Sequence, residues 1–248
     1  MSLKLIKLLS TNGGNTMKEN KKVKKIKQME NVKVVILDLD NTTWIHRKDE
    51  AKLVTDILQI PFTEEFEEQY LGMFSEVGKY FAERKMTYGK VIRLVQECMP
   101  VLQKHDMSAA DFLKNWIPIE TSFLNEDALD AVKYLKQKGY KIVVLTDWLW
   151  DCQVPLLKKY GLMPYIDKIY TCDDQYLKKN PKSAARIIEE GCEEDYVIIG
   201  DSLKDDIAFA NHAGIRSIWF NPEGKKNETG FKPTLEIASM LEVCRIIA

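Results

Sequence analysis

The chain has 248 residues, of which 45% are hydrophobic and 29% are charged, so a well-buried core is expected and a fibrous or wholly disordered chain is excluded. The net charge of -1 is unevenly divided, because residues 1–30 hold eight Lys against two acidic residues and the remainder carries a net charge of -7. An acidic body argues against a broad nucleic-acid surface and suits a protein that gathers carboxylates around a cation.

The first segment, residues 1–30, is predicted to be a basic leader that is solvated and flexible. No apolar run approaches the roughly 20 residues of a membrane span, and the opening residues lack a small-residue cleavage site. The five cysteines form no Cys-x-x-Cys pair and are odd in number, as is typical of reduced thiols. We therefore expect a cytoplasmic protein that binds neither nucleic acid nor a membrane.

Short apolar, β-branched runs predict buried strands at 32–37, 141–145, 196–199 and 215–220, with a weaker candidate at 168–171. Helices are expected between and after them, at 125–138, from Asp151 to just before Gly161, at 183–190, at 205–213, and after a cap at Thr234. Pro155 is expected in or near the first turn of its helix. Strands that alternate with helices predict an α/β fold, a parallel sheet with helices on both faces.

Between Thr43 and Thr121 the pattern changes, and no convincing strand is found there. Apolar residues recur at helical spacing in 63–84, 87–98 and 108–116. A block of about eighty residues is too long to be a loop. The predicted organisation is therefore a leader at 1–30, a core made of 31–42 and 122–248, and an inserted helical cap at 43–121.

Polar residues follow three of the predicted strands. Asp38 follows the first, Thr146 follows the strand at 141–145, and Asp201 follows the strand at 196–199 and Gly200. Ligands of open parallel sheets bind at the carboxyl ends of the strands. We therefore expect these three residues to converge on one rim of the sheet.

Two acidic clusters stand at that rim. In the first, the segment DLDNT at 38–42, an extended backbone places Asp38 and Asp40 on the same side. Carboxylates held close together repel each other and need a cation or a shared proton. Mg²⁺ is the natural partner, because it demands oxygen ligands.

The second cluster, GDSLKDD at 200–206, places Asp201 at a strand end and Asp205 or Asp206 about one helical turn further on. A basic residue is needed to balance this charge and to bind phosphate, and three lysines occur in the loop and helix start at 176–183: Lys178, Lys179 and Lys182. A lysine about 4 Å from a carboxylate gains about 4 kcal/mol at an effective dielectric constant of 20. At least one of the three is expected to be functional.

With these motifs the chain resembles the haloacid dehalogenase-like hydrolase superfamily over residues 32–222. The segment at 38–42 looks like the first family motif, VVLTD at 143–147 like the second, and VIIGDSLKDD at 197–206 like the fourth. Asp147 stands where Asn is common. In the third motif, Lys-Pro-x-Pro, alignment of the second proline with Pro181 places the lysine at Lys178, with Lys179 as the alternative.

The resemblance implies a Rossmann-like catalytic core with a mobile helical cap, and a Mg²⁺-dependent phosphatase that forms an aspartyl phosphate. Asp38 would attack phosphorus, and Asp40 would protonate the leaving group and then activate water. The phosphoryl oxygens would be bound at the second and third motifs, by Thr146, Asp147, Lys178 and Lys179. Mg²⁺ would be held by the Asp38 side chain, the Asp40 carbonyl and Asp201, with Asp205 or Asp206 in or just behind that shell.

The expected substrate is a small phosphorylated metabolite, a sugar phosphate or a nucleotide, because the cap shape and not the fold sets it. A phosphosugar mutase uses the same five groups and stays open as an alternative. A receiver-like phosphoacceptor module is another, although its acids are adjacent and it has no large insert. A catalytically silent binding protein is disfavoured by the intact motifs, and a dehalogenase by Asp40. Trp148 and Trp150 are expected to pack in the core rather than to wall the pocket.

Overall fold

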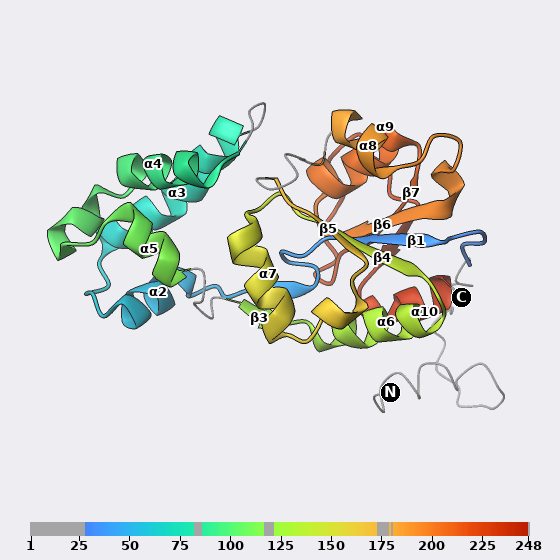
Figure 1. The fold of residues 1–248 in the computed structure, drawn as a ribbon, viewed down its shortest axis with the longest axis horizontal. Helices are drawn as coiled ribbons and strands as arrows, with labels where there is room; N and C mark the ends of the chain where they lie inside the picture. The colour runs from blue at the N-terminus through green and yellow to red at the C-terminus, as the bar shows by residue number, and fades with distance from the viewer. Residues whose placement is uncertain (1–27, 82–85, 117–121, 173–178, 180, 248) are drawn as a thin grey trace.

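The computed structural model describes residues 28–81, 86–116, 122–172, 179 and 181–247. Six strands form one sheet in the order β5-β4-β1-β6-β7-β8, and every neighbouring pair is parallel. The strands are β1 (Val34–Leu37), β4 (Lys141–Leu145), β5 (Lys168–Tyr170), β6 (Tyr196–Gly200), β7 (Arg216–Phe220) and β8 (Leu235–Ile237). The predicted α/β, Rossmann-like fold is confirmed, including the weaker strand candidate at 168–171 (Figure 1).

Helices cover both faces of this sheet, which explains why its strands are apolar on both sides. On one face lie α6 (Glu126–Gln137) and α10 (Val243–Ile246), and on the other lie α8 (Pro181–Ile187) and α9 (Ala208–Ala213) (Figure 1). Alternate residues of β1 follow this division. Val35 and Leu37 pack with the α6 and α10 cluster, whereas Ile36 packs with the α8 and α9 cluster.

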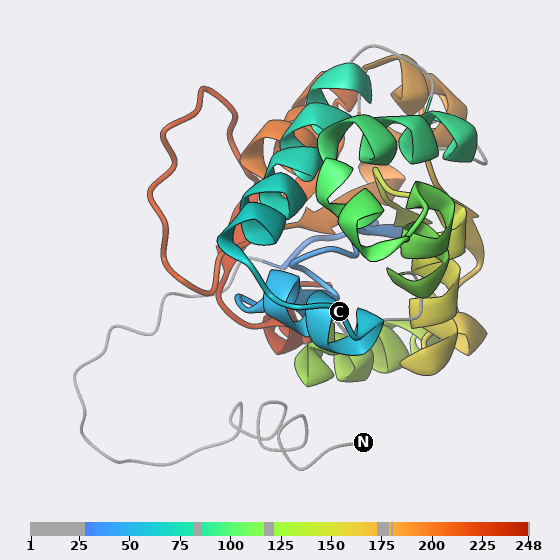
Figure 2. The ribbon, with the colours of Figure 1, turned by 90° about the vertical axis from the view of Figure 1, so that its left-hand side faces the viewer.

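A helical unit stands over one end of the sheet (Figures 1 and 2). It contains α2 (Glu50–Leu58), α3 (Glu64–Phe81), α4 (Tyr88–Cys98) and α5 (Ala109–Trp116), with a 3₁₀ turn at Pro100–His105. Its own buried core includes Phe66, Tyr70 and Phe112, and Leu149 and Cys152 at the start of α7 (Trp150–Lys159) join that core from below. The helices predicted at 63–84, 87–98 and 108–116 correspond to α3, α4 and α5, and the predicted part at 82–84 lies outside the described residues.

The expectation that no strand lies in the inserted block was wrong. Trp44–His46 forms β2, which pairs antiparallel with β3 (Ser122–Leu124) and ties both ends of the block to the core. Each strand has three residues, too few for a period-two pattern to emerge from the sequence.

Two details at helix boundaries also differ from the predictions. Thr234 does not cap a helix. Its side chain accepts a hydrogen bond from the Ser217 N–H, and the residues that follow it form β8. The last helical segment begins instead after Ser239, which forms a capping box with Glu242. Pro155 is the sixth residue of α7, in its second turn rather than its first.

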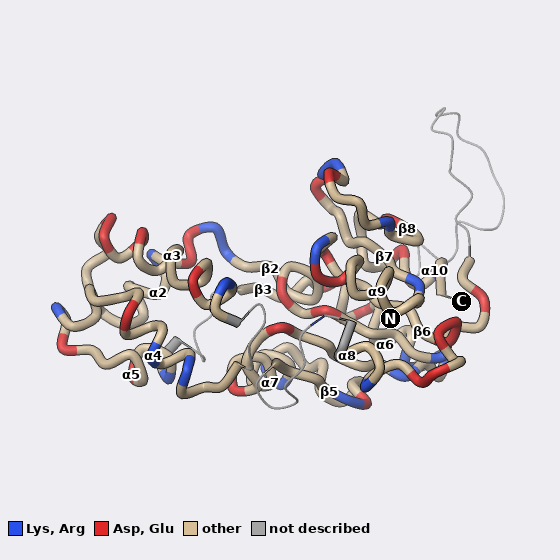
Figure 3. The backbone as a smooth tube through the Cα atoms, turned by 90° about the horizontal axis from the view of Figure 1, so that it is seen from above, with Lys and Arg blue, Asp and Glu red and all other residues tan. Residues whose placement is uncertain are grey.

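Basic and acidic positions are interspersed along the described backbone of both the cap and the core (Figure 3). Near the end of the basic segment, Met29 is buried and its N–H donates to the Ile246 carbonyl. Within the described ranges, none of the helices has both the length and the apolar character needed to cross a bilayer.

Candidate active site

The carboxyl ends of three adjacent strands form the floor of the site. Leu37, the last residue of β1, pairs with Val144 of β4 on one side and with Ile199 of β6 on the other. Asp38, Thr146 and Asp201 follow these strands directly, so the register brings them to the same rim. Sequence and structure agree on this convergence.

Asp38 is held in place by the turn that follows it. Its side chain is buried, and its Oδ2 accepts a hydrogen bond from Thr42 Oγ1 at 3.0 Å. Thr43 Oγ1 donates to the Asp38 carbonyl at 2.7 Å. Asn41 adopts a left-handed conformation with φ of 58°, which a short polar side chain tolerates and which reverses the chain toward β2.

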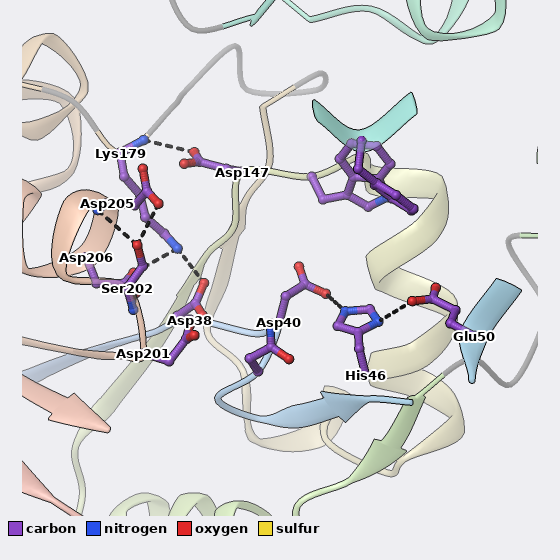
Figure 4. A pocket seen from close by; sticks show the side chains of 13 residues that line it. Asp38, Asp40, His46, Glu50, Asp147, Lys179, Asp201, Ser202, Asp205 and Asp206 are labelled. Carbon is purple, nitrogen blue, oxygen red and sulfur yellow. Dashed lines mark hydrogen bonds and ion pairs between the residues drawn. The ribbon is translucent and has the colours of Figure 1, made fainter. Parts of the chain in front are cut away.

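Asp40 turns its carboxylate away from Asp38, toward β2 and α7 (Figure 4). Its Oδ1 accepts from Trp44 Nε1 at 3.0 Å and lies 2.9 Å from His46 Nε2. Its Oδ2 accepts from Gln153 Nε2 at 2.6 Å. Burial alone would raise the pKa of Asp40, but the hydrogen bonds from His46, Trp44 and Gln153 outweigh burial and lower it.

Asp38 forms an acidic cluster with Asp201 and Asp206. Asp38, Asp201 and Asp206 each offer a carboxylate oxygen, and these oxygens all lie within 4.8 Å of one another. Asp206 belongs to a π-helical turn, Leu203–Ile207, and its Oδ2 accepts from the Ser202 N–H at 3.0 Å. Gly200 makes room for it, because a Cβ at that position would overlap the Asp206 side chain.

Asp205 lies apart from this cluster. It is exposed, and its Oδ2 accepts a hydrogen bond from Ser202 Oγ at 2.6 Å. The sequence left Asp205 and Asp206 as equal candidates for the metal shell, and the structure brings the Asp206 carboxylate, rather than that of Asp205, close to Asp38 and Asp201.

Lys179 is the cation of the site (Figure 4). Its Nζ forms an ion pair with Asp38 Oδ1 and a second one, of 2.8 Å, with Asp206 Oδ1, and its side chain is only 5% exposed. Its backbone N–H donates to Asp147 Oδ1 at 2.9 Å, so a residue of the second motif holds the backbone of Lys179. Lys178, favoured by alignment on Pro181, lies outside the described residues.

Thr146 is fully buried at the end of β4. Its Oγ1 accepts from the Trp148 N–H and from Gln153 Nε2, both at 3.3 Å. Gln153 therefore bridges Thr146 and Asp40. Neither Gln153 nor His46 lies in a motif, and no signal in the sequence marked them.

The electrostatics of the cluster call for more positive charge than is supplied by Lys179, the one lysine that the described residues place in contact with it. Burial, followed by the negative charge of Asp38, raises the pKa of Asp201 to about 7. Burial and Asp38 likewise raise the pKa of Asp206 well above its usual value. Burial would lower the pKa of Lys179, but Asp206 and Asp38 hold it well above its usual value. Three converging carboxylates with one lysine fit a hard divalent cation such as Mg²⁺.

A cavity of about 440 Å³ opens above these groups, between the core and the cap. Besides the acidic cluster and Lys179, it is lined by His46, Glu50 and Phe74 and by Trp148. The rings of Phe74 and Trp148 have centroids 6.1 Å apart. Trp148, expected to pack in the core, thus also forms part of the pocket wall.

Comparison with known proteins agrees with this geometry. Residues 32–214 match the family described as haloacid dehalogenase-like hydrolase. The HAD-hydrolase YfnB of Bacillus subtilis is 25% identical over 228 residues, which cover 88% of this chain and 97% of YfnB. The pyrimidine 5'-nucleotidase PynA of Streptococcus pneumoniae is 30% identical over 116 residues, or 45% of this chain and 49% of PynA.

Solved structures share the fold. YfnB, in a crystal structure bound to magnesium, aligns with a TM-score of 0.66 at 23% identity, covering 88% of this chain and 99% of that one. A HAD phosphatase from Thermococcus onnurineus aligns with a TM-score of 0.59 at 21% identity, covering 87% and 97%. The chain therefore belongs to the haloacid dehalogenase-like hydrolases, as a phosphatase-type member with a helical cap.

Proposed function

We propose that this protein is a Mg²⁺-dependent phosphohydrolase that cleaves a small phosphate monoester through a phosphoryl group carried on Asp38. The observation that carries the proposal is the environment of Asp38. A buried carboxylate stands at a strand end, in contact with Lys179 and beside Asp201 and Asp206. Such a carboxylate can act as the nucleophile, while Lys179 and a Mg²⁺ ion held by the neighbouring carboxylates would offset the negative charge of a phosphoryl group.

The first step is the attack of an Asp38 carboxylate oxygen on phosphorus. The bond from phosphorus to the ester oxygen breaks, and Asp40 delivers a proton to the departing oxygen. Thr146 and Lys179 hold the phosphoryl oxygens. Mg²⁺, held by Asp38, the Asp40 carbonyl, Asp201 and Asp206, would neutralise charge on the transferring group.

The second step returns Asp38 to its free form. Asp40, now a carboxylate, takes a proton from water, and that water attacks phosphorus so that inorganic phosphate leaves. The hydrogen bonds that lower the pKa of Asp40 favour its carboxylate form, which is the form this step requires. Release of free phosphate distinguishes this reaction from that of a mutase, which returns the phosphoryl group to a sugar.

The metal requirement is tested by phosphate release from a monoester before and after treatment with a chelator. We expect activity to vanish with chelator and to return with Mg²⁺. Asp201→Asn should need far more Mg²⁺ for half-maximal activity, whereas the exposed neighbour Asp205→Asn is the matched control and should not. Full activity of the unmodified protein in metal-free buffer would refute the proposal.

For the substrate, the cavity favours a nucleotide over a sugar phosphate. Phe74 of the cap and Trp148 of the core offer aromatic faces on which a base can stack. Among similar proteins PynA is named a nucleotidase, while another is named a glyceraldehyde 3-phosphate phosphatase, so both classes belong in a screen.

That screen compares nucleoside monophosphates with sugar phosphates in Mg²⁺. Phe74→Ala should raise KM for a nucleotide by about 5- to 150-fold, the value of one stacked base, and leave KM for acetyl phosphate nearly unchanged. Equal KM values for a nucleotide in both proteins would exclude stacking on Phe74.

We place the protein in the cytoplasm, because all five cysteines are free thiols.

A further inference from the structure

The side chain of Asp40 is connected to the cap through two further residues (Figure 4). His46, the last residue of β2, lies with Nε2 at 2.9 Å from Asp40 Oδ1. On the other side of the imidazole ring, His46 Nδ1 faces Glu50 Oε2 at 3.8 Å. Glu50 is the first residue of α2, and therefore belongs to the cap.

Within the cap, the Glu50 carboxylate is held by a hydrogen bond. Tyr70, buried in the cap core on α3, donates a hydrogen bond from its hydroxyl to Glu50 Oε1 at 2.8 Å. The position of the Glu50 carboxylate is thus set by the packing of α2 and α3. His46 in turn stands where the chain passes from the core to the cap, so it contacts a residue of each.

The contact between His46 and Glu50 is incomplete. His46 Nδ1 is buried and has no hydrogen-bond partner, while 3.8 Å exceeds the 2.7–3.2 Å range of a hydrogen bond. A displacement of about 1 Å of α2 toward β2 would close that gap. The other two partners of Asp40, Trp44 and Gln153, belong to β2 and α7.

We propose that His46 and Glu50 are positioning residues for Asp40, through which the cap orients the carboxyl that exchanges protons with the leaving group and with water. This inference rests on the proposed phosphohydrolase function. When α2 approaches β2, Glu50 holds His46 Nδ1, and the His46 ring then fixes the Asp40 carboxyl. A cap closed over substrate therefore aligns Asp40, and an open cap leaves it less constrained.

The test is a rapid-quench measurement of phosphoenzyme formation with two esters in Mg²⁺. An alkyl phosphate needs a proton on its leaving oxygen, whereas an activated aryl phosphate does not. The variants are Glu50→Ala, Glu50→Gln and His46→Gln. The matched control is Asp56→Ala, which removes an exposed acid from the same helix without touching the site.

We expect Glu50→Ala to slow the alkyl phosphate burst by about 10- to 100-fold, as is typical for loss of a residue that orients a functional group. The aryl phosphate burst should change by less than about 3-fold, because its leaving group departs without a proton. Glu50→Gln, which keeps a polar group facing His46, should recover part of the loss. His46→Gln keeps a donor near Asp40 but cannot reach Glu50, so in that background Glu50→Ala should have no further effect.

Equal loss for both esters, or no loss for either, would overturn the positioning role. So would a fully additive effect of Glu50→Ala in the His46→Gln protein, or an equal ester-selective loss in Asp56→Ala. If the unmodified protein forms no phosphoenzyme with either ester, the proposed function itself fails and the inference fails with it. If the unmodified protein forms phosphoenzyme and Glu50→Ala forms it at the same rate with the alkyl ester, only the inference fails.

Discussion

Replacement of Lys179 by Met should reduce both the stability of the metal-free protein and its turnover. The Lys179 side chain is 5% exposed and contacts Asp38 and Asp206, whose side chains are 6% and 0% exposed. Methionine keeps the length and the apolar stem of lysine but leaves the two carboxylates without their cation.

The expected magnitude follows from this burial. Removal of one partner from a buried ion pair costs about 3–5 kcal/mol, because an uncompensated charge remains inside. For a chain of this size, 1 kcal/mol corresponds to about 2–4 °C in Tm, so Tm should fall by about 6–20 °C in chelator near pH 7.5. The loss should shrink as pH falls, because Asp206, whose pKa burial raises, can then take up a proton instead.

The assay is a pair of thermal melts, in chelator and in excess Mg²⁺, together with phosphate release from a monoester. Mg²⁺ should restore part of the Tm of Lys179→Met, because it supplies charge to the same carboxylates, but should not restore turnover. Lys178→Met is the companion variant and should keep both properties. An unchanged Tm for Lys179→Met in chelator would refute the electrostatic argument, and loss of turnover in Lys178→Met alone would move the assignment by one residue.

Further outcomes concern the acidic cluster and the N-terminal segment. The pKa of Asp201 is raised to about 7, above the value of about 3.8 in the unfolded chain, so without metal the free energy of unfolding should fall by up to about 4 kcal/mol as pH rises from 4 to 7. Urea titrations at several pH values check this, and a flat profile would contradict it. Mg²⁺ should accordingly bind about tenfold more weakly for each pH unit below 7, measured by calorimetry. Gly200→Ala should displace Asp206, lower stability by about 1–3 kcal/mol and weaken Mg²⁺ binding, whereas unchanged binding would show that the turn can shift. A chain that starts at Met17 should keep its Tm and turnover, because described packing begins at Met29; a large loss in either would show that the removed residues pack on the body.

The rim of the sheet could be predicted because each of its features has a local signal. A buried strand is an apolar run, and a functional strand end is a polar residue that stops it. Asp38, Thr146 and Asp201 meet both conditions. Because their strands pair in parallel, the residues that follow them lie at the same edge of the sheet.

Residues chosen by fine geometry could not be predicted in the same way. Asp205 and Asp206 are adjacent on a helical turn, so they point about 100° apart, and only burial decides which one faces Asp38. The lysine was ambiguous because one proline of the motif is absent, and a loop carries no period that would fix the register. His46 and Gln153 reach Asp40 from elements outside the motifs, and Gln153 does so from 113 residues away.

The central claim, that a phosphoryl group is carried on Asp38, is tested most directly by locating that group. Asp40→Asn should slow water attack, so phosphoenzyme should accumulate when this variant is mixed with an activated aryl phosphate and Mg²⁺ and then quenched in acid. Mass spectrometry of the digested protein should place the added phosphoryl group on Asp38, and Asp38→Asn protein treated in the same way should carry none. A phosphoryl group on any other residue, or in the Asp38→Asn protein, would contradict the account.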